Sequence, residues 1–119
     1  MKKHALVIGG TGATGKEIIR LLINSSEFSK VTVFVRRKTQ INDKKINEHI
    51  INFDNINKYK KLIIGDILFS CLGTTRAEAG SKRKQYIVDY TYQYEFAKIA
   101  ATNGVKNYSL VSSIGANKN

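Results

Sequence analysis

Residues 5–16 read Ala5-Leu6-Val7-Ile8-Gly9-Gly10-Thr11-Gly12-Ala13-Thr14-Gly15-Lys16. In this stretch a short apolar run stops at a cluster of glycines, and an amphipathic segment follows at residues 17–24. That order predicts a β-strand, a tight turn and an α-helix in direct succession. Gly10, Gly12 and Gly15 also satisfy the pattern G-x-G-x-x-G, which is typical of dinucleotide-binding turns.

Each glycine of such a turn has a physical task. One adopts backbone angles that a Cβ atom would forbid, one lets the main chain approach a pyrophosphate, and one lets the helix pack closely on the strand. The helix then directs its free N–H groups and its positive dipole end toward the phosphates. We therefore expect the diphosphate to be bound by the turn and the first helical residues, which are Gly9, Thr11, Gly12, Ala13, Thr14 and Gly15.

A second phosphate-binding motif overlaps this turn. Residues 10–16 read G-x-x-x-x-G-K, the beginning of a P-loop. The next residue is Glu17, where a P-loop needs a Ser or Thr hydroxyl to bind Mg²⁺, and a carboxylate there would repel the phosphates of a nucleoside triphosphate. We therefore reject the P-loop and expect Lys16 to be a solvated side chain in the first turn of the helix.

The composition is that of one small globular domain covering residues 1–119. Hydrophobic residues make up 42% of the 119, and no run approaches the roughly 18 apolar residues of a membrane span. The basic start is followed by too short an apolar run for a signal peptide. Cys71 is the single cysteine, so no intrachain disulfide or cysteine zinc site is expected, and the two histidines have no ligand cluster around them. These features favour a reducing, cytoplasmic location.

The formal net charge of +11 is large for this length. It is compatible with nucleic-acid binding, with attraction of anionic cofactors, or with a solvated lysine-rich surface. The basic residues are scattered, and we find no zinc finger, basic zipper or RNA-recognition sequence. The solvated surface is the favoured interpretation, and nucleic-acid binding is a minor alternative.

The rest of the chain alternates strands with helices. We expect strands at residues 4–8, 30–36, 48–53, 67–71 and 107–111, and helices at 13–25, 56–64 and 84–103. This alternation predicts an α/β fold of the Rossmann type, with a parallel sheet, right-handed crossovers and helices on both faces. The expected strand order is 3-2-1-4-5. The ligand crevice then lies beyond the carboxyl ends of strands one and four.

The second predicted strand ends in Arg36 and Arg37, and Arg36 comes 21 residues after Gly15. A dinucleotide domain reads the adenosine ribose about 20 residues past its glycines. An acidic residue there binds the 2′-hydroxyl of NAD, whereas the planar fork of an arginine suits the 2′-phosphate of NADP. We therefore expect NADP(H) to be preferred over NAD(H), with a plain surface role for both arginines as the alternative. Asp54 follows the third strand and is expected either to bond the adenine amino group or to cap a helix.

Further contacts are expected where the fourth and fifth strands end. Leu72, Gly73 and Thr74 follow the fourth strand, and a glycine there suits a backbone that passes close to a ligand. Ser112 and Ser113 follow the fifth strand. Because parallel strands end at one edge of a sheet, we expect these residues to converge with the glycine turn and Arg36.

Two other features are interpreted as structural. Cys71 is expected to be a small core residue rather than a nucleophile, because no histidine lies near it in the pattern. Tyr86, Tyr90 and Tyr94 recur at four-residue spacing, in line with Ala97 and Ala101, and this stripe is expected to be core packing rather than a stacking platform for bases.

Four motifs taken together resemble the atypical short-chain dehydrogenase/reductases, in the branch of the Tat-interacting oxidoreductase and the nitrogen-regulator-like proteins. They are GGTGATG, VRR, CLGTTR and VSSIGA at residues 9–15, 35–37, 71–76 and 111–116. The resemblance spans the whole chain. It implies an NADP(H)-dependent reductase of the Rossmann type, in which a serine after the fifth strand orients the substrate carbonyl. The matching position is Ser113, with Ser112 as the weaker candidate.

The same resemblance implies a tyrosine that donates the proton and a lysine that lowers its pKa, in a Y-x-x-x-K segment after the fifth strand. The sequence stops at Asn119, before such a segment. We therefore expect the N-terminal part of a longer protein, without its substrate-binding region and without hydride transfer of its own. The alternative is a non-catalytic NADP(H) sensor that binds a partner protein. A small-molecule substrate is expected but not identified, membrane association is not expected, and homo-oligomers are possible.

Overall fold

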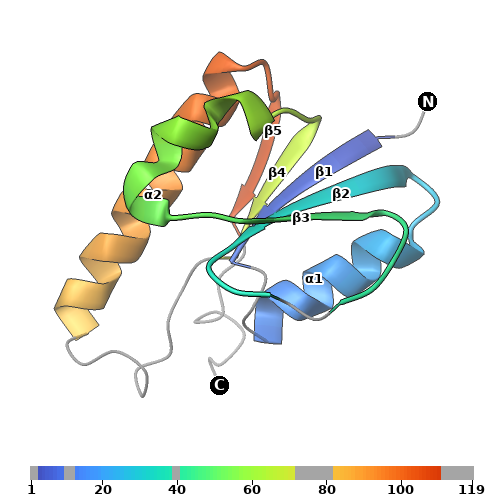
Figure 1. Cartoon of the computed structure of the whole chain (residues 1–119), viewed down its shortest axis with the longest axis horizontal. Helices are drawn as coiled ribbons and strands as arrows, with labels where there is room; N and C mark the ends of the chain where they lie inside the picture. Colours follow the sequence, from blue (N-terminus) through green and yellow to red (C-terminus); the bar gives the residue numbers. More distant parts are fainter. Residues whose placement is uncertain (1–2, 10–12, 39–40, 72–81, 111–119) are drawn as a thin grey trace.

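The structure is a computed structural model that describes residues 3–9, 13–38, 41–71 and 82–110 (Figure 1). Within these residues the chain forms one five-stranded sheet and three helical segments. The strands are β1 (Lys3–Ile8), β2 (Phe28–Val35), β3 (Ile46–Ile50), β4 (Ile67–Ser70) and β5 (Asn107–Leu110). The helical segments are α1 (Ala13–Asn24), the 3₁₀ segment η1 (Phe53–Leu62) and α2 (Lys82–Thr102).

The sheet is parallel and has the order β3-β2-β1-β4-β5, which confirms the predicted Rossmann-like topology. β1 lies in the middle, with β2 on one side and β4 on the other. The side chains of residues 5–8 and 31–35 are buried almost completely. Strands buried on both faces carry continuous apolar runs, and this is why the two runs predicted a parallel sheet correctly.

Helical segments cover the two faces of the sheet (Figure 1). On one face Leu6 and Phe34 belong to an apolar cluster with Phe53 of η1 and with Phe96 and Ala100 of α2. On the other face α1 lies against β1 and β2, through a cluster that includes Ala5, Val7, Val33, Ile19 and Leu22. Alternate residues of each strand therefore belong to opposite cores, as the two-residue period of a strand requires.

The predicted core stripe of the long helix is followed only in part: Ala97 packs against the core, Tyr94 does not, and the side chains of Tyr86 and Tyr90 lie outside the described residues. Tyr94 is 58% exposed, and α2 packs on the sheet through Phe96 and Ala100 instead. Residues four apart are offset by about 40° around a helix of 3.6 residues per turn, so residues at four-residue spacing do not all stay on one buried face. Ala101, at the end of that stripe, is also exposed.

The segment after β3 differs from the prediction in kind and in limits. β3 ends at Ile50, and a 3₁₀ segment starts at Phe53, three residues before the expected helix. The Asn52 side chain accepts a hydrogen bond from the Asp54 backbone N–H, 2.9 Å long, and is the N-cap. The alternative in which Asp54 caps this helix is therefore wrong, because the cap lies two residues earlier.

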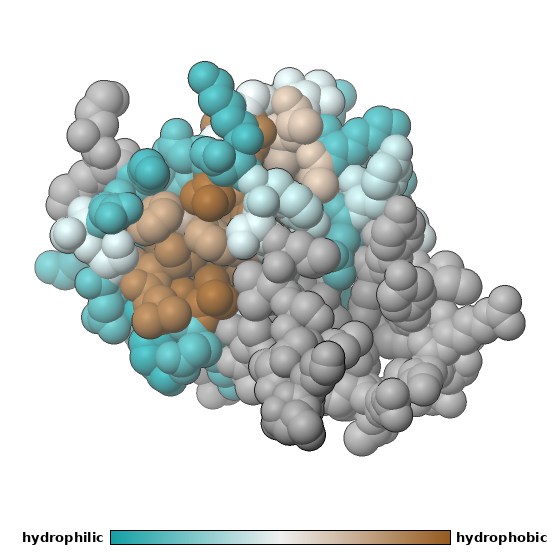
Figure 2. Space-filling view, turned by 180° about the vertical axis from the view of Figure 1, so that it is seen from behind, coloured by the Kyte–Doolittle hydropathy of each residue, from teal (hydrophilic) through white to brown (hydrophobic). Residues whose placement is uncertain are grey.

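Two large apolar side chains of the helical segments are exposed, Leu21 of α1 and Leu62 of η1. Each lies on the outer side of its segment, while Ile19 and Ile63 are buried. Figure 2, which views the molecule from behind, shows an apolar area with hydrophilic side chains along its left and lower edges. On the α1 side of the sheet, Ile67 and Phe69 of β4 are only half-buried.

Candidate functional site

The glycine turn begins where β1 ends. Gly9 has a φ of 80°, a left-handed conformation in which a side chain would be strained, as the sequence predicted for such a turn. Gly15, in the first turn of α1, is buried, whereas Lys16 is exposed as expected. Residues 10–12 lie outside the described residues, as do the side chains of Ala13 and Thr14. The described residues thus include the positive-φ glycine that begins a phosphate-binding turn and the helix that follows the turn.

The ends of β1 and β4 lie side by side. Ile8 is paired with Ser70, and the Cys71 N–H donates to the Ile8 carbonyl at 2.8 Å, so Gly9 and Cys71 leave the sheet together. From β1 the chain adds β2 and β3 on one side of the sheet, and then crosses to add β4 and β5 on the other side. The gap between the ends of β1 and β4 is therefore the point where the strand order reverses. Ligands of open α/β sheets bind at such a point, beyond the carboxyl ends of the strands. Leu72, Gly73, Thr74, Ser112 and Ser113 lie outside the described residues, so their contacts stay predictions.

Cys71 is a core residue, as predicted. It is buried in the cluster on the α1 side of the sheet. Burial raises the pKa of its thiol to about 11, because removing water penalises the thiolate. At neutral pH the sulfur therefore stays protonated, which argues against nucleophilic chemistry at this position.

Arg36 lies at the carboxyl end of β2, directly after Val35, and is exposed together with Arg37. Its guanidinium carbon lies 5.7 Å from the centre of the Phe53 ring and 5.6 Å from the centre of the Tyr92 ring. Among the described residues Arg36 forms no ion pair, so no carboxylate neutralises its charge there. An uncompensated guanidinium at this edge is suited to an anionic group.

Asp54 lies next to these aromatic rings. Its Oδ1 accepts a hydrogen bond from the Tyr92 hydroxyl at 2.7 Å. Sequence reasoning singled out Arg36 and Asp54 but missed Phe53 and Tyr92. Phe53 was assigned to the end of a strand, and Tyr92 stands outside the four-residue stripe, so neither carried a signal that would connect it with Arg36.

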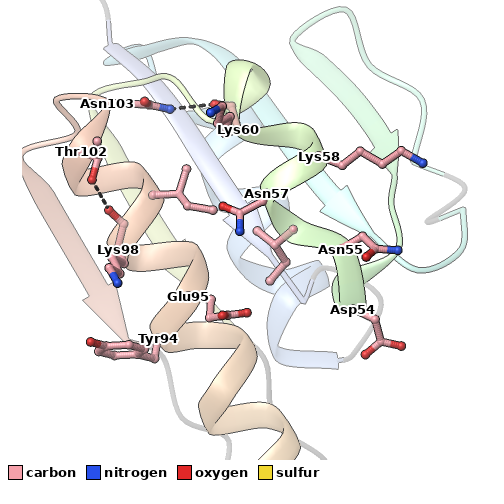
Figure 3. Close-up of a pocket in the computed structure, with 12 residues that line it drawn as sticks. Asp54, Asn55, Asn57, Lys58, Lys60, Tyr94, Glu95, Lys98, Thr102 and Asn103 are labelled. Atoms are coloured by element: carbon pink, nitrogen blue, oxygen red, sulfur yellow. Dashed lines mark hydrogen bonds between the residues drawn. The ribbon is translucent and has the colours of Figure 1, made fainter.

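An open polar groove of about 870 Å³ lies between η1 and α2 (Figure 3). Its walls carry charges of both signs, from Lys58 and Lys98 on one hand and from Glu95 on the other. Among the predicted site residues that the structure describes, Asp54 lines this groove, whereas Gly9 and Arg36 do not. The groove therefore does not coincide with the described part of the predicted crevice.

Two classes of site find no support in the described ranges. His, Cys, Asp and Glu side chains there form no group of three or more that could bind a metal ion. No described helix combines the length and the apolar character needed to cross a bilayer.

A family model described as NAD(P)H-binding matches residues 9–119, from the positive-φ glycine to the end of the chain. This chain belongs to the NAD(P)H-binding family. The match begins at the residue where β1 gives way to the glycine turn. It agrees with the dinucleotide fold that the sequence predicted.

The curated relatives include a protein of the Tat-interacting branch that the motifs indicated. Protein HTATIP2 of Rattus norvegicus is 34% identical over 120 residues, which cover 98% of this chain and 49% of that protein. Protein FMP52-1, mitochondrial, of Scheffersomyces stipitis is 38% identical over 118 residues, covering 95% of this chain and 51% of the relative. Protein FMP52, mitochondrial, of Kluyveromyces lactis is 37% identical, covering 98% and 53%. The chain thus spans about half the length of these relatives.

Solved structures share the fold. A short-chain dehydrogenase/reductase superfamily protein from Agrobacterium tumefaciens with bound NAD has a TM-score of 0.68 at 18% identity, over 90% of this chain and 31% of that one. The Bordetella bronchiseptica enzyme WbmG in complex with NAD has a TM-score of 0.74 at 12% identity, over 92% and 37%. At these identities the likeness establishes the Rossmann-like fold and nothing finer.

The comparisons contradict the predicted cytoplasmic location, because the yeast relatives are named mitochondrial. The prediction depended on a single cysteine and on the lack of a secretory signal pattern. Both features argue against an oxidising compartment, but they do not separate one reducing compartment from another.

Proposed function

We propose that this chain is the coenzyme-binding portion of an NADP(H)-dependent oxidoreductase of the short-chain dehydrogenase/reductase type. In the whole protein the reaction would be hydride transfer with a carbonyl substrate. Residues 1–119 would form one Rossmann-type domain. The observation that carries the NADP preference is the Arg36 guanidinium, which lies at the carboxyl end of β2 with no ion-pair partner among the described residues.

The residues fit a dinucleotide in a consistent order along the carboxyl edge of the sheet. The diphosphate would rest on Gly9, the turn through Thr11 and Gly12, and the start of α1 at Ala13, Thr14 and Gly15. Arg36 would bind the 2′-phosphate, with Arg37 beside it. Asp54 would accept from the adenine amino group. The positive φ of Gly9 and the exposed guanidinium are the features of this structure that support the assignment.

The opposite end of the coenzyme would reach the ends of β4 and β5. Leu72, Gly73, Thr74 and Ser112 would line the nicotinamide ribose. Ser113 would donate a hydrogen bond to the substrate carbonyl and orient it for reaction. The bound nicotinamide supplies the hydride chemistry, and the protein supplies binding, orientation and electrostatics.

Coenzyme titration of the purified protein by calorimetry tests this proposal. We expect NADP⁺ to bind at least tenfold more tightly than NAD⁺. Arg36→Glu should weaken NADP⁺ by about tenfold to a hundredfold, the size of a lost hydrogen bond to a charged group, and should reverse the preference.

Lys106→Glu provides the matched control, because it makes the same change of charge at an exposed residue between α2 and β5. It should leave the ratio of the two dissociation constants unchanged. If calorimetry detects no binding heat with either NADP⁺ or NAD⁺, the proposal is overturned altogether. Tight binding of NAD⁺ that Arg36→Glu does not alter would overturn the assignment of Arg36 alone.

A further inference from the structure

Three side chains from three elements meet at the carboxyl end of β2. Arg36 follows β2, Phe53 opens η1, and Tyr92 lies on α2. The guanidinium carbon lies 5.7 Å from the Phe53 ring centre and 5.6 Å from the Tyr92 ring centre, and the two ring centres are 5.5 Å apart. These separations are within the range of cation–π contacts and aromatic pairs. The cation therefore lies over two neighbouring rings at once.

Both rings are held by the rest of the fold. Phe53 is buried and belongs to the core cluster that includes Phe34 and Phe96. Tyr92 packs against the same cluster, and its hydroxyl donates to Asp54 Oδ1 at 2.7 Å. The Tyr92 ring is thus anchored at its apolar body and at its polar end, which joins α2 to the start of η1.

A held guanidinium binds a phosphate better than a free one. An arginine side chain has about 2 kcal/mol of rotamer entropy to lose, and a position already restricted before binding lessens that loss on complex formation. Stacking on a ring uses the flat face of the guanidinium and leaves its in-plane N–H groups available for bidentate bonds to phosphate. No described carboxylate forms an ion pair with Arg36 to compete for those groups.

We propose that Tyr92 is a positioning residue for coenzyme discrimination, which together with Phe53 holds Arg36 in place for the 2′-phosphate of NADP(H). This inference rests on the proposed role of Arg36. It assigns part of the coenzyme specificity to α2, an element that contains none of the residues expected to touch the dinucleotide.

The experiment compares NADP⁺ and NAD⁺ binding by calorimetry for the wild type, Arg36→Ala, Tyr92→Leu and the double variant. Relative to Tyr92→Phe, which also lacks the hydroxyl that bonds Asp54, Tyr92→Leu should weaken NADP⁺ by about twofold to fivefold, the size of an exposed cation–π contact, and leave NAD⁺ unchanged. Tyr92→Phe keeps the ring and should retain most of the wild-type affinity for NADP⁺. In the Arg36→Ala background Tyr92→Leu should cost nothing more, because the residue acts through Arg36.

Tyr108→Leu is the control, since it removes an exposed tyrosine from β5, at the opposite side of the sheet from β2. If Tyr92→Leu does not fold, Tyr92→Gln removes the ring and keeps a polar end near Asp54. The positioning role of Tyr92 is overturned if its variants weaken the binding of both coenzymes equally, or of neither, although Arg36→Ala abolishes the preference for NADP⁺. That outcome leaves the role of Arg36 intact. A wild type without any preference, unaffected by Arg36→Ala, overturns the role of Arg36 and this inference together.

Discussion

At the scale of single residues, His4 shows how a position on a central strand changes the chemistry of a side chain. Its backbone N–H donates to Asp66 Oδ2 at 2.7 Å, and its Nε2 lies 2.6 Å from the Thr32 hydroxyl. Burial, and then the charge of Lys30, lower the pKa of this imidazole, against the opposing effect of Asp66. The folded protein therefore favours the neutral ring.

A dependence of stability on pH follows from this lowered pKa. Below the ordinary histidine pKa of about 6.5 the unfolded chain binds a proton that the folded chain resists, so the free energy of unfolding should fall as the pH falls. The stability that the neutral His4 ring contributes is fully present above the pKa of the unfolded chain. It is lost as the pH falls through the lower His4 pKa of the folded protein. Urea unfolding of wild type and His4→Gln at pH 8 and pH 5.5 measures it. Equal pH dependence in the two proteins would contradict the assignment.

At the scale of elements, polar side chains close the ends of the helical segments. Lys45 donates from Nζ to the carbonyls of Ile23 and Ser25, at 2.8 and 2.9 Å, where α1 ends. The Asn103 amide donates to the Lys60 carbonyl (Figure 3). It also donates to the Ile63 carbonyl, so that it joins the end of α2 to the end of η1. Carbonyls at a helix end have no partner within the helix, so such side chains replace the missing donors.

The lysine at the end of α1 gives a test of this stabilisation. Lys45→Met keeps most of the aliphatic stem and removes two hydrogen bonds and a charge that favours the negative end of the helix dipole, so the free energy of unfolding should decrease by about 1–2 kcal/mol. Lys44→Met is the matched control, because Lys44 is exposed and should change it by less than about 0.5 kcal/mol. Chemical denaturation measures the free energy of unfolding of both variants. Equal losses in the two would contradict a stabilising role for Lys45.

At the scale of the whole molecule, the helical segments that the structure describes cover the two faces of the sheet unevenly. η1 and α2 cover one face, while on the other face α1 lies over β1 and β2 and leaves Ile67 and Phe69 of β4 half-buried. The apolar cluster with the large aromatic side chains lies on the η1 and α2 side, where Phe34 meets Phe96 at a ring separation of 5.0 Å. The described fold should therefore depend strongly on that side.

Phe34→Ala tests this dependence. Phe34 is fully buried between His49 and Phe96, so the truncation should cost about 3–5 kcal/mol through lost transfer energy and the cavity left behind. A loss of this size is a large part of the roughly 5–15 kcal/mol that stabilises a typical domain. Leu21→Ala, at an exposed residue of α1, should cost far less. Thermal and urea unfolding compare the two, and similar losses would show that this core is not the main source of stability.

The glycine turn after β1 and the position of Arg36 at the end of β2 could be predicted because they depend on local sequence. A glycine with positive φ must follow β1 if the chain is to turn tightly into α1, and Gly9 does. Arg36 could be assigned by counting from the turn, since one helix and one strand of ordinary length separate the two positions. Tyr92 could not, because a helix distant in sequence brings it to Arg36.

The sequence by itself determined the parallel sheet, its strand order and the place of the glycine turn, because alternating strands and helices with right-handed crossovers leave few other arrangements. Only the tertiary structure decided which face of α2 is buried, which residue caps η1 and what surrounds Arg36. These outcomes depend on how elements distant in the chain pack against one another. A periodic pattern within one segment contains no information about which of its side chains will meet a partner from another.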